Sequence, residues 1–492
     1  MLSDISKKIT RGIRWASFEI FSLKLIGILS AVIISRLLTP DDFGLYGIAN
    51  SIIVLAMILT FTGFEGAIIQ KEDVDTSDLD SAWTLELFKY LILGGILYLI
   101  APIIEQLLKI NGTSNVLRLS CLSVSVLAFR NIGVVLYRKE LNLDKLYYLN
   151  VLPKIISTFC TIFLAYTYRN VYALLYGYLI QNLLMVVFSY IVHPYRPKIS
   201  FSLSRILDLF NFGKWVLLSS ILNFVQRQGL NLFIGRYWDV TVLGYFNRSN
   251  TFTRGQFSQF QKLYSKLIFP VFSKLQNDEA ALMRNFLLVI KHTSFFFGVL
   301  ISLVYIYTDE FIFFILGIAW KPIIPYMKGL LLLTFLETIS YPFNSFFSAI
   351  GKPKIITSAT ALRAILIIIF ALPVSRSYDL DGLIIVLICS CLSSFIIYFF
   401  KNHKLFLGKK NKILFSLIPG LTIGSIIIIT DIIYFGMIND LRLVLISLLI
   451  NILVVLTSVI IMERYISLEL HKFLNLIFRN NRLNKLFEVI SK

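Results

Sequence analysis

The stretch RWASFEIFSLKLIGILSAVIISRLL, residues 14–38, decides how this chain folds. As a helix it is long enough to cross a hydrocarbon core roughly 30 Å thick. We do not expect it to be a signal peptide, because its apolar part is too long and no small-x-small cleavage site follows. Glu19 and Lys24 lie inside it, and a charge at bilayer depth costs about 2.5–3.5 kcal/mol on insertion scales. We therefore expect a membrane-spanning helix whose charged side chains face a protein-lined interior.

Similar apolar runs follow one another along all 492 residues, of which 57% are hydrophobic and 15% charged. Soluble domains are about 25% charged, and no polar stretch here is long enough to form one. The sequence predicts an all-α integral membrane protein with about fourteen transmembrane helices. The expected spans are 14–38, 43–69, 81–108, 114–137, 146–168, 171–192, 212–236, 241–272, 284–308, 322–350, 354–376, 380–401, 412–435 and 440–463.

The net charge of +19 has a topological explanation. Most Lys and Arg residues lie in short loops between apolar runs, and the loops on the side of the N-terminus hold more of them than the opposite loops, which is the positive-inside pattern. With an even number of spans, both termini are expected in the cytoplasm. Nucleic-acid binding is not expected, because it would need basic residues gathered on a water-exposed face. The loops that carry this pattern include Arg138, Lys139, Lys145, Arg196, Lys198, Lys352, Lys354, Lys404 and Lys409.

The sequence contains no motif for metal binding or for nucleophilic catalysis. The four cysteines lie within apolar runs and the four histidines lie far apart. Cys389 and Cys391 are two residues apart, which is not a metal-ligand spacing, and no HExxH arrangement occurs. We expect no metal, no cofactor and no catalytic residue.

The chain also repeats itself at an offset of 200 residues. Trp15 matches Trp215, Arg36 matches Arg236, and Phe43-Gly44-Leu45-Tyr46 matches Leu243-Gly244-Tyr245-Phe246. Six spans separate the copies, so both enter the membrane from the same side, and the substrate path is expected between the halves. The predicted parts are a six-helix N-lobe, a loop with an amphipathic helix, a pseudo-symmetric six-helix C-lobe, two added spans and a basic tail. Their bounds are 1–192, 193–211, 212–401, 402–463 and 464–492.

Two segments have an amphipathic rather than a spanning pattern. One is the short stretch 204–211, expected at the cytoplasmic surface. In the tail, Ile466, Leu470 and Phe473 share one helical face, with Lys472 and Arg479 away from it. This pattern favours an interfacial helix near anionic headgroups; the alternative is a solvated tail.

The turn Leu38-Thr39-Pro40-Asp41-Asp42 has a mechanical interpretation. Thr39 can cap a helix, and Pro40 suits its first position. Asp41 and Asp42 favour the positive end of the helix dipole. We expect this turn to start the second span.

Cationic and amide side chains fall inside several spans. In span eight, Arg248, Gly255, Gln259, Lys262 and Lys266 lie within about 60° of one another at 100° per residue. Such a stripe is costly against lipid and suits an anionic ligand, while snorkelling to a headgroup is the alternative for each charge. The residues expected to line a central cationic cavity are Arg130, Asn223, Gln226, Arg227, Arg248, Gln259, Lys262 and Arg363.

Three carboxylates inside spans are expected partners for these cations. Glu86 and Lys89 are three residues apart and are expected to pair with each other. Glu19 and Glu337 are the better candidates for coupling transport to proton movement, although they can also form structural pairs.

Several motifs resemble the polysaccharide-transporter (Wzx-like) branch of the multidrug/oligosaccharidyl-lipid/polysaccharide flippase superfamily, in particular the colanic-acid and teichuronic-acid exporter type. The resemblance is carried by Trp15 with Phe18-Glu19, by 36–44, by 66–70, by 244–248 and by 269–278. It implies two lobes around a central cavity, and movement of an undecaprenyl-pyrophosphate-linked oligosaccharide to the outer leaflet by alternating access. The resemblance also implies a place in a bacterial cytoplasmic membrane. Membrane lipids, a polysaccharide polymerase and glycosyltransferases are the implied partners. Glu65 stands where such exporters usually have a small or apolar residue.

Three other functions remain open at this point. A polymerase or ligase of the same pathway would need a large external loop, and every outer loop here is short. A drug exporter of the same superfamily would share the architecture. A peptidoglycan-precursor flippase would also share it, and deletion would then be lethal.

Overall fold

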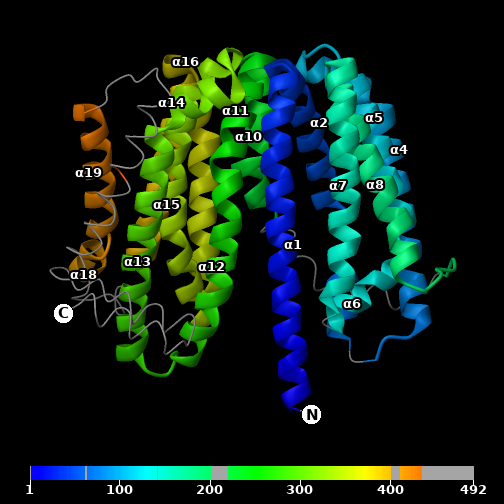
Figure 1. Cartoon of the computed structure of the whole chain (residues 1–492), viewed down its shortest axis with the longest axis horizontal. Helices are drawn as coiled ribbons and strands as arrows, with labels where there is room; N and C mark the ends of the chain where they lie inside the picture. The colour runs from blue at the N-terminus through cyan, green and yellow to red at the C-terminus, as the bar shows by residue number, and fades with distance from the viewer. Residues whose placement is uncertain are drawn as a thin grey trace. The chain divides into compact units, whose positions relative to one another are not determined.

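The computed structural model describes residues 2–60, 64–71, 73–140, 142–200, 220–400, 410–434 and 451. Over these residues the regular structure is helical (Figure 1). Eight of the helices are long and apolar enough to span a membrane, or up to nine if one bent pair counts as a span. The all-α membrane fold is thus confirmed, while the number fourteen stays a prediction. Segments 204–211, 464–492 and most of 440–463 lie outside the described residues.

The chain divides into two compact units, Met1–Asn247 and Arg248–Lys492. The end of the N-lobe at residue 192 and the start of the C-lobe at residue 212 remain predictions. The helices of the first unit are α1 (Leu2–Leu37), α2 (Pro40–Leu59), α3 (Phe64–Gln70), α4 (Thr76–Leu108), α5 (Thr113–Val126), η1 (Leu127–Phe129), η2 (Ile132–Val134), α6 (Val135–Lys139), α7 (Leu143–Tyr168), α8 (Tyr172–Val192), α10 (Gly229–Tyr237) and α11 (Val240–Phe252), which runs across the boundary.

The second unit contains α12 (Arg254–Lys274), α13 (Glu279–Ile306), α14 (Thr308–Glu310), η3 (Phe311–Leu316), η4 (Ile318–Ile323), α15 (Ile324–Ala349), α16 (Pro353–Phe400), α18 (Lys410–Phe415) and α19 (Ile418–Tyr434). Helix α16 covers two predicted spans, and its backbone leaves helical geometry at Tyr378 and Asp379. An aromatic core holds α12, α13 and α15 together, with the Phe286 ring centroid 6.1 Å from that of Phe272 on α12 and 4.5 Å from that of Phe346 on α15.

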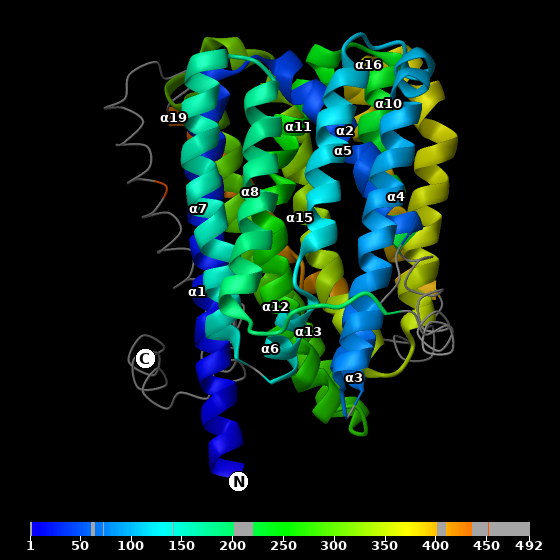
Figure 2. The ribbon, with the colours of Figure 1, turned by 90° about the vertical axis from the view of Figure 1, so that its right-hand side faces the viewer.

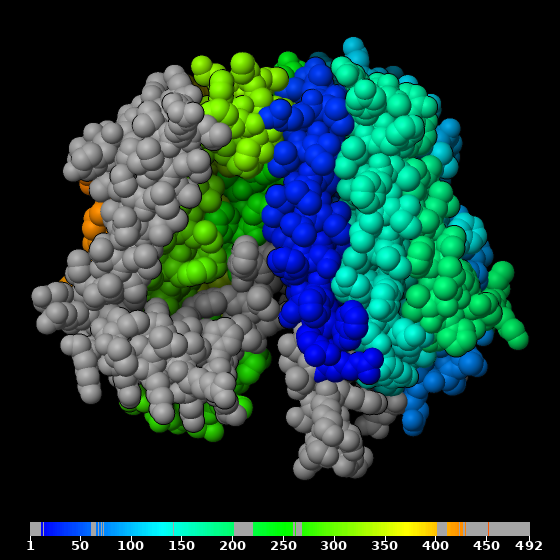
Figure 3. Space-filling model, viewed as in Figure 1, coloured from blue at the N-terminus to red at the C-terminus, as the bar shows by residue number. Residues whose placement is uncertain are grey.

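Apolar side chains on the outer faces of these helices are exposed. Helix α1 lies on the surface of the first unit beside α7 (Figures 1 and 3). Only 11% of the residues in its most apolar stretch, within Arg14–Leu37, are buried. Leu99 on α4 and Phe159 on α7 are 75% and 70% exposed. Large apolar exposure of this kind marks a surface that contacts lipid.

The turn before α2 folds as predicted. Helix α2 begins at Pro40, and Thr39 precedes it in an extended conformation. The Asp42 carboxylate accepts hydrogen bonds from the backbone N–H and the hydroxyl of Thr39, at 2.9 and 2.7 Å. The carboxylate therefore satisfies a helix-start donor and lies at the positive end of the dipole.

The two copies of the sequence repeat meet reciprocally within the first unit. A Cβ on Gly44 would lie 2.1 Å from the Val240 carbonyl oxygen, and one on Gly244 would lie 1.8 Å from the Pro40 carbonyl oxygen. Both contacts therefore require glycine. They are equivalent under the repeat, because Gly44 corresponds to Gly244 and Pro40 corresponds to Val240 at the offset of 200. The Thr241 hydroxyl likewise donates to the Asp41 carboxylate, again at an offset of 200. This symmetry supports the duplication.

Two predicted spans are interrupted. Span eight, predicted as one helix over 241–272, is wrong in this respect, because Thr253 takes φ −106° and ψ −96° between α11 and α12. An angle of 100° per residue cannot be carried across that break, so Arg248 and Gly255 need not share a face. Span four is the bent pair Thr113–Phe129 and Ile132–Lys139, with 73° between its halves.

Candidate functional site

Arg130 lies where the fourth predicted span breaks. The chain turns from η1 into an extended residue, Arg130, with φ −64° and ψ 134°, and re-enters helix at Ile132. Such a break leaves backbone groups without helical partners, and in a membrane they must be satisfied by protein or by a wet cavity.

Asn131 satisfies much of this break. Its side chain is fully buried at 0% exposure. Its Oδ1 accepts from the Gly133 N–H at 2.9 Å, and its Nδ2 donates to the Tyr195 carbonyl at 2.7 Å. Its own N–H donates to the Ser189 hydroxyl at 3.0 Å. These bonds fix the backbone that presents the Arg130 side chain.

One partner of Asn131, Tyr195, belongs to an irregular segment, residues 193–200, which we call the clasp. It leaves the end of α8 and crosses towards α4 (Figure 2). The Asp80 carboxylate accepts from the Tyr195 hydroxyl and from the Lys198 N–H, the latter at 2.8 Å. Ser200 N–H donates to the Thr84 hydroxyl at 3.0 Å. The clasp therefore ties α4 and α8 to the break at Arg130.

His193 begins the clasp and is nearly buried. Burial lowers the pKa of its imidazole, and Arg196 acts in the same direction while Glu140 opposes it. A Cβ on Gly133 would lie 2.6 Å from the His193 ring, so the break packs directly on this imidazole.

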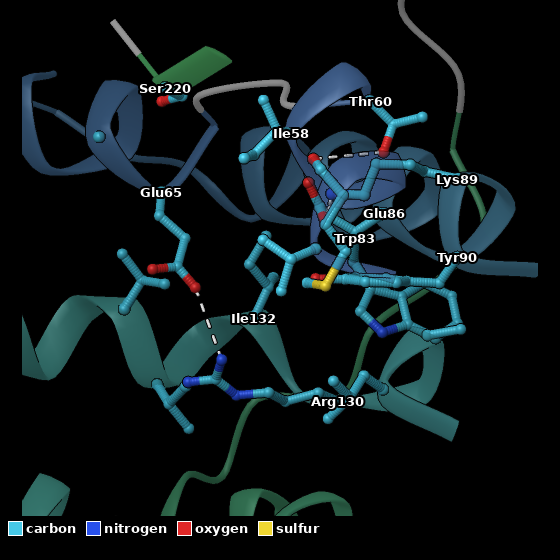
Figure 4. A pocket seen from close by; sticks show the side chains of 17 residues that line it. Ile58, Thr60, Glu65, Trp83, Glu86, Lys89, Tyr90, Arg130, Ile132 and Ser220 are labelled. Carbon is cyan, nitrogen blue, oxygen red and sulfur yellow. Dashed lines mark hydrogen bonds and ion pairs between the residues drawn. The ribbon is translucent and has the colours of Figure 1, made fainter. Parts of the chain in front are cut away.

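A cavity of about 500 Å³ opens beside the break, entirely within the first unit (Figure 4). Its apolar wall comes from α2 and from the broken span, which contribute Val54, Met57, Ile58, Leu127, Ile132 and Val135. Most of its polar side chains come from α3, α4 and the break, namely Glu65, Trp83, Glu86, Lys89, Tyr90 and Arg130, and Thr60 and Ser220 complete the polar lining. Because α3 and α6 lie at the same end of the unit as the N-terminus (Figure 2), the cavity lies toward the predicted cytoplasmic side.

Four of these charges form ion pairs. The Glu65 Oε1 lies 3.6 Å from Arg130 Nη1, and its Oε2 lies 2.9 Å from Nη1 of Arg138 on α6. Glu86 and Lys89 pair with each other, which confirms that prediction. Figure 4 shows Glu65 pointing towards Arg130, with Trp83, Glu86, Lys89 and Tyr90 grouped on the other side of Ile132.

Two buried donors of the cavity have no hydrogen-bond partner within the described part of the chain. They are the Arg130 Nε and the Trp83 Nε1. Leaving a buried donor unsatisfied costs about 1–3 kcal/mol, so the arrangement favours a ligand that brings oxygen acceptors. Phosphate oxygens and sugar hydroxyls are such acceptors.

A second charged cluster lies in the second unit and is buried. Glu337 on α15 accepts from Arg254 on α12 at 3.1 and 2.8 Å, and from Arg363 on α16 at 2.8 Å. The side chains of Arg254, Glu337 and Arg363 are 4%, 8% and 13% exposed. The predicted pairing of Glu337 with a span cation is confirmed.

The predicted site residues fall in different places. Arg130 lines the first-unit cavity, while Arg363 lies in the buried cluster. Asn223, Gln226 and Arg227 lie in the helical stretch 220–227, where Gln226 is buried and the other two are exposed. Arg248 lies on α11, and the side chains of Gln259 and Lys262 lie outside the described residues. Glu19 accepts from the Asn150 amide at 2.8 Å.

Sequence reasoning missed Arg254, Asn131 and Trp83. Arg254 stands seven residues before Gln261, which donates to Thr338 beside Glu337 at 2.6 Å. That spacing puts both residues on one face of α12, and it could have identified Arg254. No local signal marks Asn131, because its partners Ser189 and Tyr195 lie about sixty residues further along the chain.

Comparison with known proteins agrees with this architecture. The family model described as polysaccharide biosynthesis protein matches residues 33–325. An uncharacterized membrane protein in the cps region of Klebsiella pneumoniae is 24% identical, over 81% of this chain and 83% of that protein. The lipopolysaccharide biosynthesis protein WzxC of Escherichia coli (strain K12) is 22% identical, over 72% of each.

Among solved structures, the lipid II flippase MurJ in an inward closed conformation is similar with a TM-score of 0.69. The match covers 92% of this chain and 99% of that one at 17% identity. At this identity the likeness establishes the fold alone, and it confirms an all-helical membrane-protein fold.

Proposed function

Because this chain belongs to the polysaccharide biosynthesis protein family, we propose that it is a flippase for lipid-linked oligosaccharides. The family match confirms the resemblance found in the sequence motifs. The proposed substrate is an oligosaccharide repeat unit on an undecaprenyl-pyrophosphate carrier. It moves from the cytoplasmic to the outer leaflet by alternating access, with no chemical step. Both termini are proposed to lie in the cytoplasm.

The observation that carries this proposal is the cavity at Arg130. A flippase must draw a phosphate and sugar headgroup out of water and past the apolar core, which requires cations and hydrogen-bond donors inside a membrane unit. The first unit places Arg130, Lys89, Trp83 and Tyr90 around one hollow. Arginine is suited to phosphate because its planar fork can donate to two oxygens.

The aromatic side chains suit the sugar part of such a substrate. Trp83 and Tyr90 offer apolar ring faces together with polar groups at their edges. Lys89 lies with its ammonium 4.4 Å from the Tyr90 ring centroid, so it is held at the wall next to the ring. A headgroup could thus place phosphate at Arg130 and sugar against the rings.

The remaining predicted residues are proposed to contact substrate at other stages of the cycle. Arg227 and Arg248 are the cations proposed for this role, with Asn223, Gln226 and Gln259 as hydrogen-bonding partners for sugar hydroxyls. Lys262 and Arg363 complete the set, and Glu19 and Glu337 remain the proposed coupling carboxylates. A polysaccharide polymerase and glycosyltransferases are the proposed pathway partners.

Export in cells tests the proposal. A strain that lacks this gene should lose its surface polysaccharide, and the wild-type gene should restore it. The Arg130→Gln variant should restore at most about a tenth of the polymer, because a lost charge-assisted hydrogen bond is worth about 1.5–3 kcal/mol. Arg169→Gln, at an exposed helix end of the same unit, is the matched control and should restore it fully. Membrane protein levels are measured by immunoblot.

Two outcomes contradict the proposal. If the deletion strain makes normal surface polysaccharide, the assigned function is wrong. If Arg130→Gln restores full export at normal protein level, the cavity at Arg130 does not bind the substrate during export. Double substitution of Arg227 and Arg248 to Ala tests the other proposed cations in the same way.

A further inference from the structure

Glu65 occupies an unusual position between two guanidinium groups. Its carboxylate uses one oxygen for Arg130, at 3.6 Å, and the other for Arg138, at 2.9 Å. Arginines also bind a phosphate group in this way, with different oxygens of one anion contacting different guanidinium groups. The carboxylate therefore stands where a phosphate could bind.

The contacts of Glu65 are weak enough to be exchanged. Its side chain is 46% exposed, and those of Arg138 and Arg130 are 44% and 24% exposed. Ion pairs with this exposure contribute at most about 1 kcal/mol to stability. A carboxylate that leaves these arginines can be solvated by water at the rim, so its displacement requires little free energy.

The cavity offers more to a phosphate than Glu65 uses. Arg130 Nε is buried without a partner in the described chain, as is Trp83 Nε1, and both residues line the hollow. A carboxylate has two oxygens, and both are already engaged by Arg130 and Arg138. A diphosphate has several more, which can reach these donors at the same time. The exchange of carboxylate for diphosphate therefore gains hydrogen bonds.

We propose that Glu65 is an internal counter-anion that holds Arg130 and Arg138 in the empty cavity and is displaced by a diphosphate headgroup. Binding moves the carboxylate to the exposed rim, and release of the headgroup allows it to return. The site is thus never left with unpaired cations, and small anions that bind weakly do not displace Glu65. The identity of the diphosphate as a lipid headgroup rests on the proposed function, whereas the exchange itself does not.

Binding to the purified full-length protein in detergent tests the exchange. The probes are farnesyl diphosphate, for a lipid-linked headgroup, and inorganic pyrophosphate, for the free anion, each titrated by calorimetry. Glu65→Gln keeps the size of the side chain and removes its charge. It should tighten farnesyl diphosphate binding about fivefold, the equivalent of removing a competing pair worth about 1 kcal/mol. Arg130→Gln and Arg138→Gln should each weaken it about tenfold or more.

Glu279→Gln is the matched control, because Glu279 is an exposed carboxylate of the second unit outside the cavity. It should leave both affinities unchanged. Unchanged or weaker binding by Glu65→Gln overturns the counter-anion, because Glu65 would then not compete with the ligand. If Glu65→Gln tightens the binding of inorganic pyrophosphate but not that of farnesyl diphosphate, the assignment of the ligand as a lipid headgroup is overturned.

The outcome is separable from the proposed function. If Glu65→Gln fails to tighten binding while Arg130→Gln still abolishes export, the exchange is wrong and the flippase stands. If the deletion strain exports normally while Glu65→Gln tightens binding, the flippase is wrong and the diphosphate site stands.

Discussion

Within the described residues, two arginine–glutamate–arginine clusters occur, one in each compact unit. In the first unit Glu65 joins Arg130 and Arg138 beside a cavity, with side chains about a quarter to a half exposed. In the second unit Glu337 joins Arg254 and Arg363, each 13% exposed or less. The composition is the same and the surroundings are opposite.

This difference separates a tightly held cluster of charges from one whose ion pairs are readily exchanged. Removing one partner of a buried ion pair leaves an uncompensated charge and costs about 3–5 kcal/mol. An exposed pair contributes about 0–1 kcal/mol. The buried cluster therefore fixes α12, α15 and α16 to one another, while the open cluster can change partners during a transport cycle.

The largest effect is expected for Glu337→Ala. It leaves two buried guanidinium groups without their carboxylate, so the free energy of unfolding of the second unit should fall by about 3–5 kcal/mol. Thermal unfolding of the purified protein in detergent measures this as a lower Tm. A Tm equal to that of the wild type would remove the distinction between the clusters.

The next effect is expected for Asn131→Ala. The substitution removes the acceptor for the Gly133 N–H and the donor to the Tyr195 carbonyl, in a fully buried place. Stability of the first unit should fall by about 1–3 kcal/mol for the unsatisfied groups. Hydrogen exchange should also accelerate across residues 193–200. Unchanged protection of the clasp would show that Asn131 does not hold the break.

A small effect on stability is expected for Glu65→Gln. Because the pair is half exposed, the free energy of unfolding should change by less than about 1 kcal/mol. The comparison with Glu337→Gln, measured in the same detergent, sharpens the contrast between the two clusters. A loss as large as that of the buried variant would show that Glu65 is structural.

The smallest effect is a dependence of the clasp on pH. Burial lowers the pKa of His193 in the folded protein, so the unfolded segment binds a proton first as the pH falls. The stability that neutral His193 contributes to the clasp is fully present above the ordinary imidazole pKa of about 6.5 and declines as the pH falls below it. Hydrogen exchange of 193–200, corrected for intrinsic rates at pH 7.5 and 5.5, should show this decline. His193→Gln should make the decline disappear, and its persistence would contradict the assignment.

Much of the fold could be predicted because hydrophobic length dictates it. Predicted spans 81–108, 146–168 and 171–192 agree with α4, α7 and α8 to within a few residues. The capped turn at Thr39 was also readable, since its signals are local.

The site was less accessible to sequence reasoning because its determinants are tertiary. The break at Arg130 contains no proline and is held by Ser189 and Tyr195, which no periodicity connects to it. Arg254 was missed because the break at Thr253 invalidates a helical projection started at Arg248. Arg130 was found because a lone charge in an apolar run is a local signal.

The most direct test of the account is lipid flipping in proteoliposomes that contain the purified protein and a fluorescent oligosaccharide on a polyprenyl diphosphate. Transfer to the opposite leaflet is followed by loss of accessibility to an external quencher. The account predicts rapid transfer with the wild type and the Arg169→Gln control, and at least about a tenfold slower rate with Arg130→Gln. Equal rates for Arg130→Gln and the wild type would contradict it.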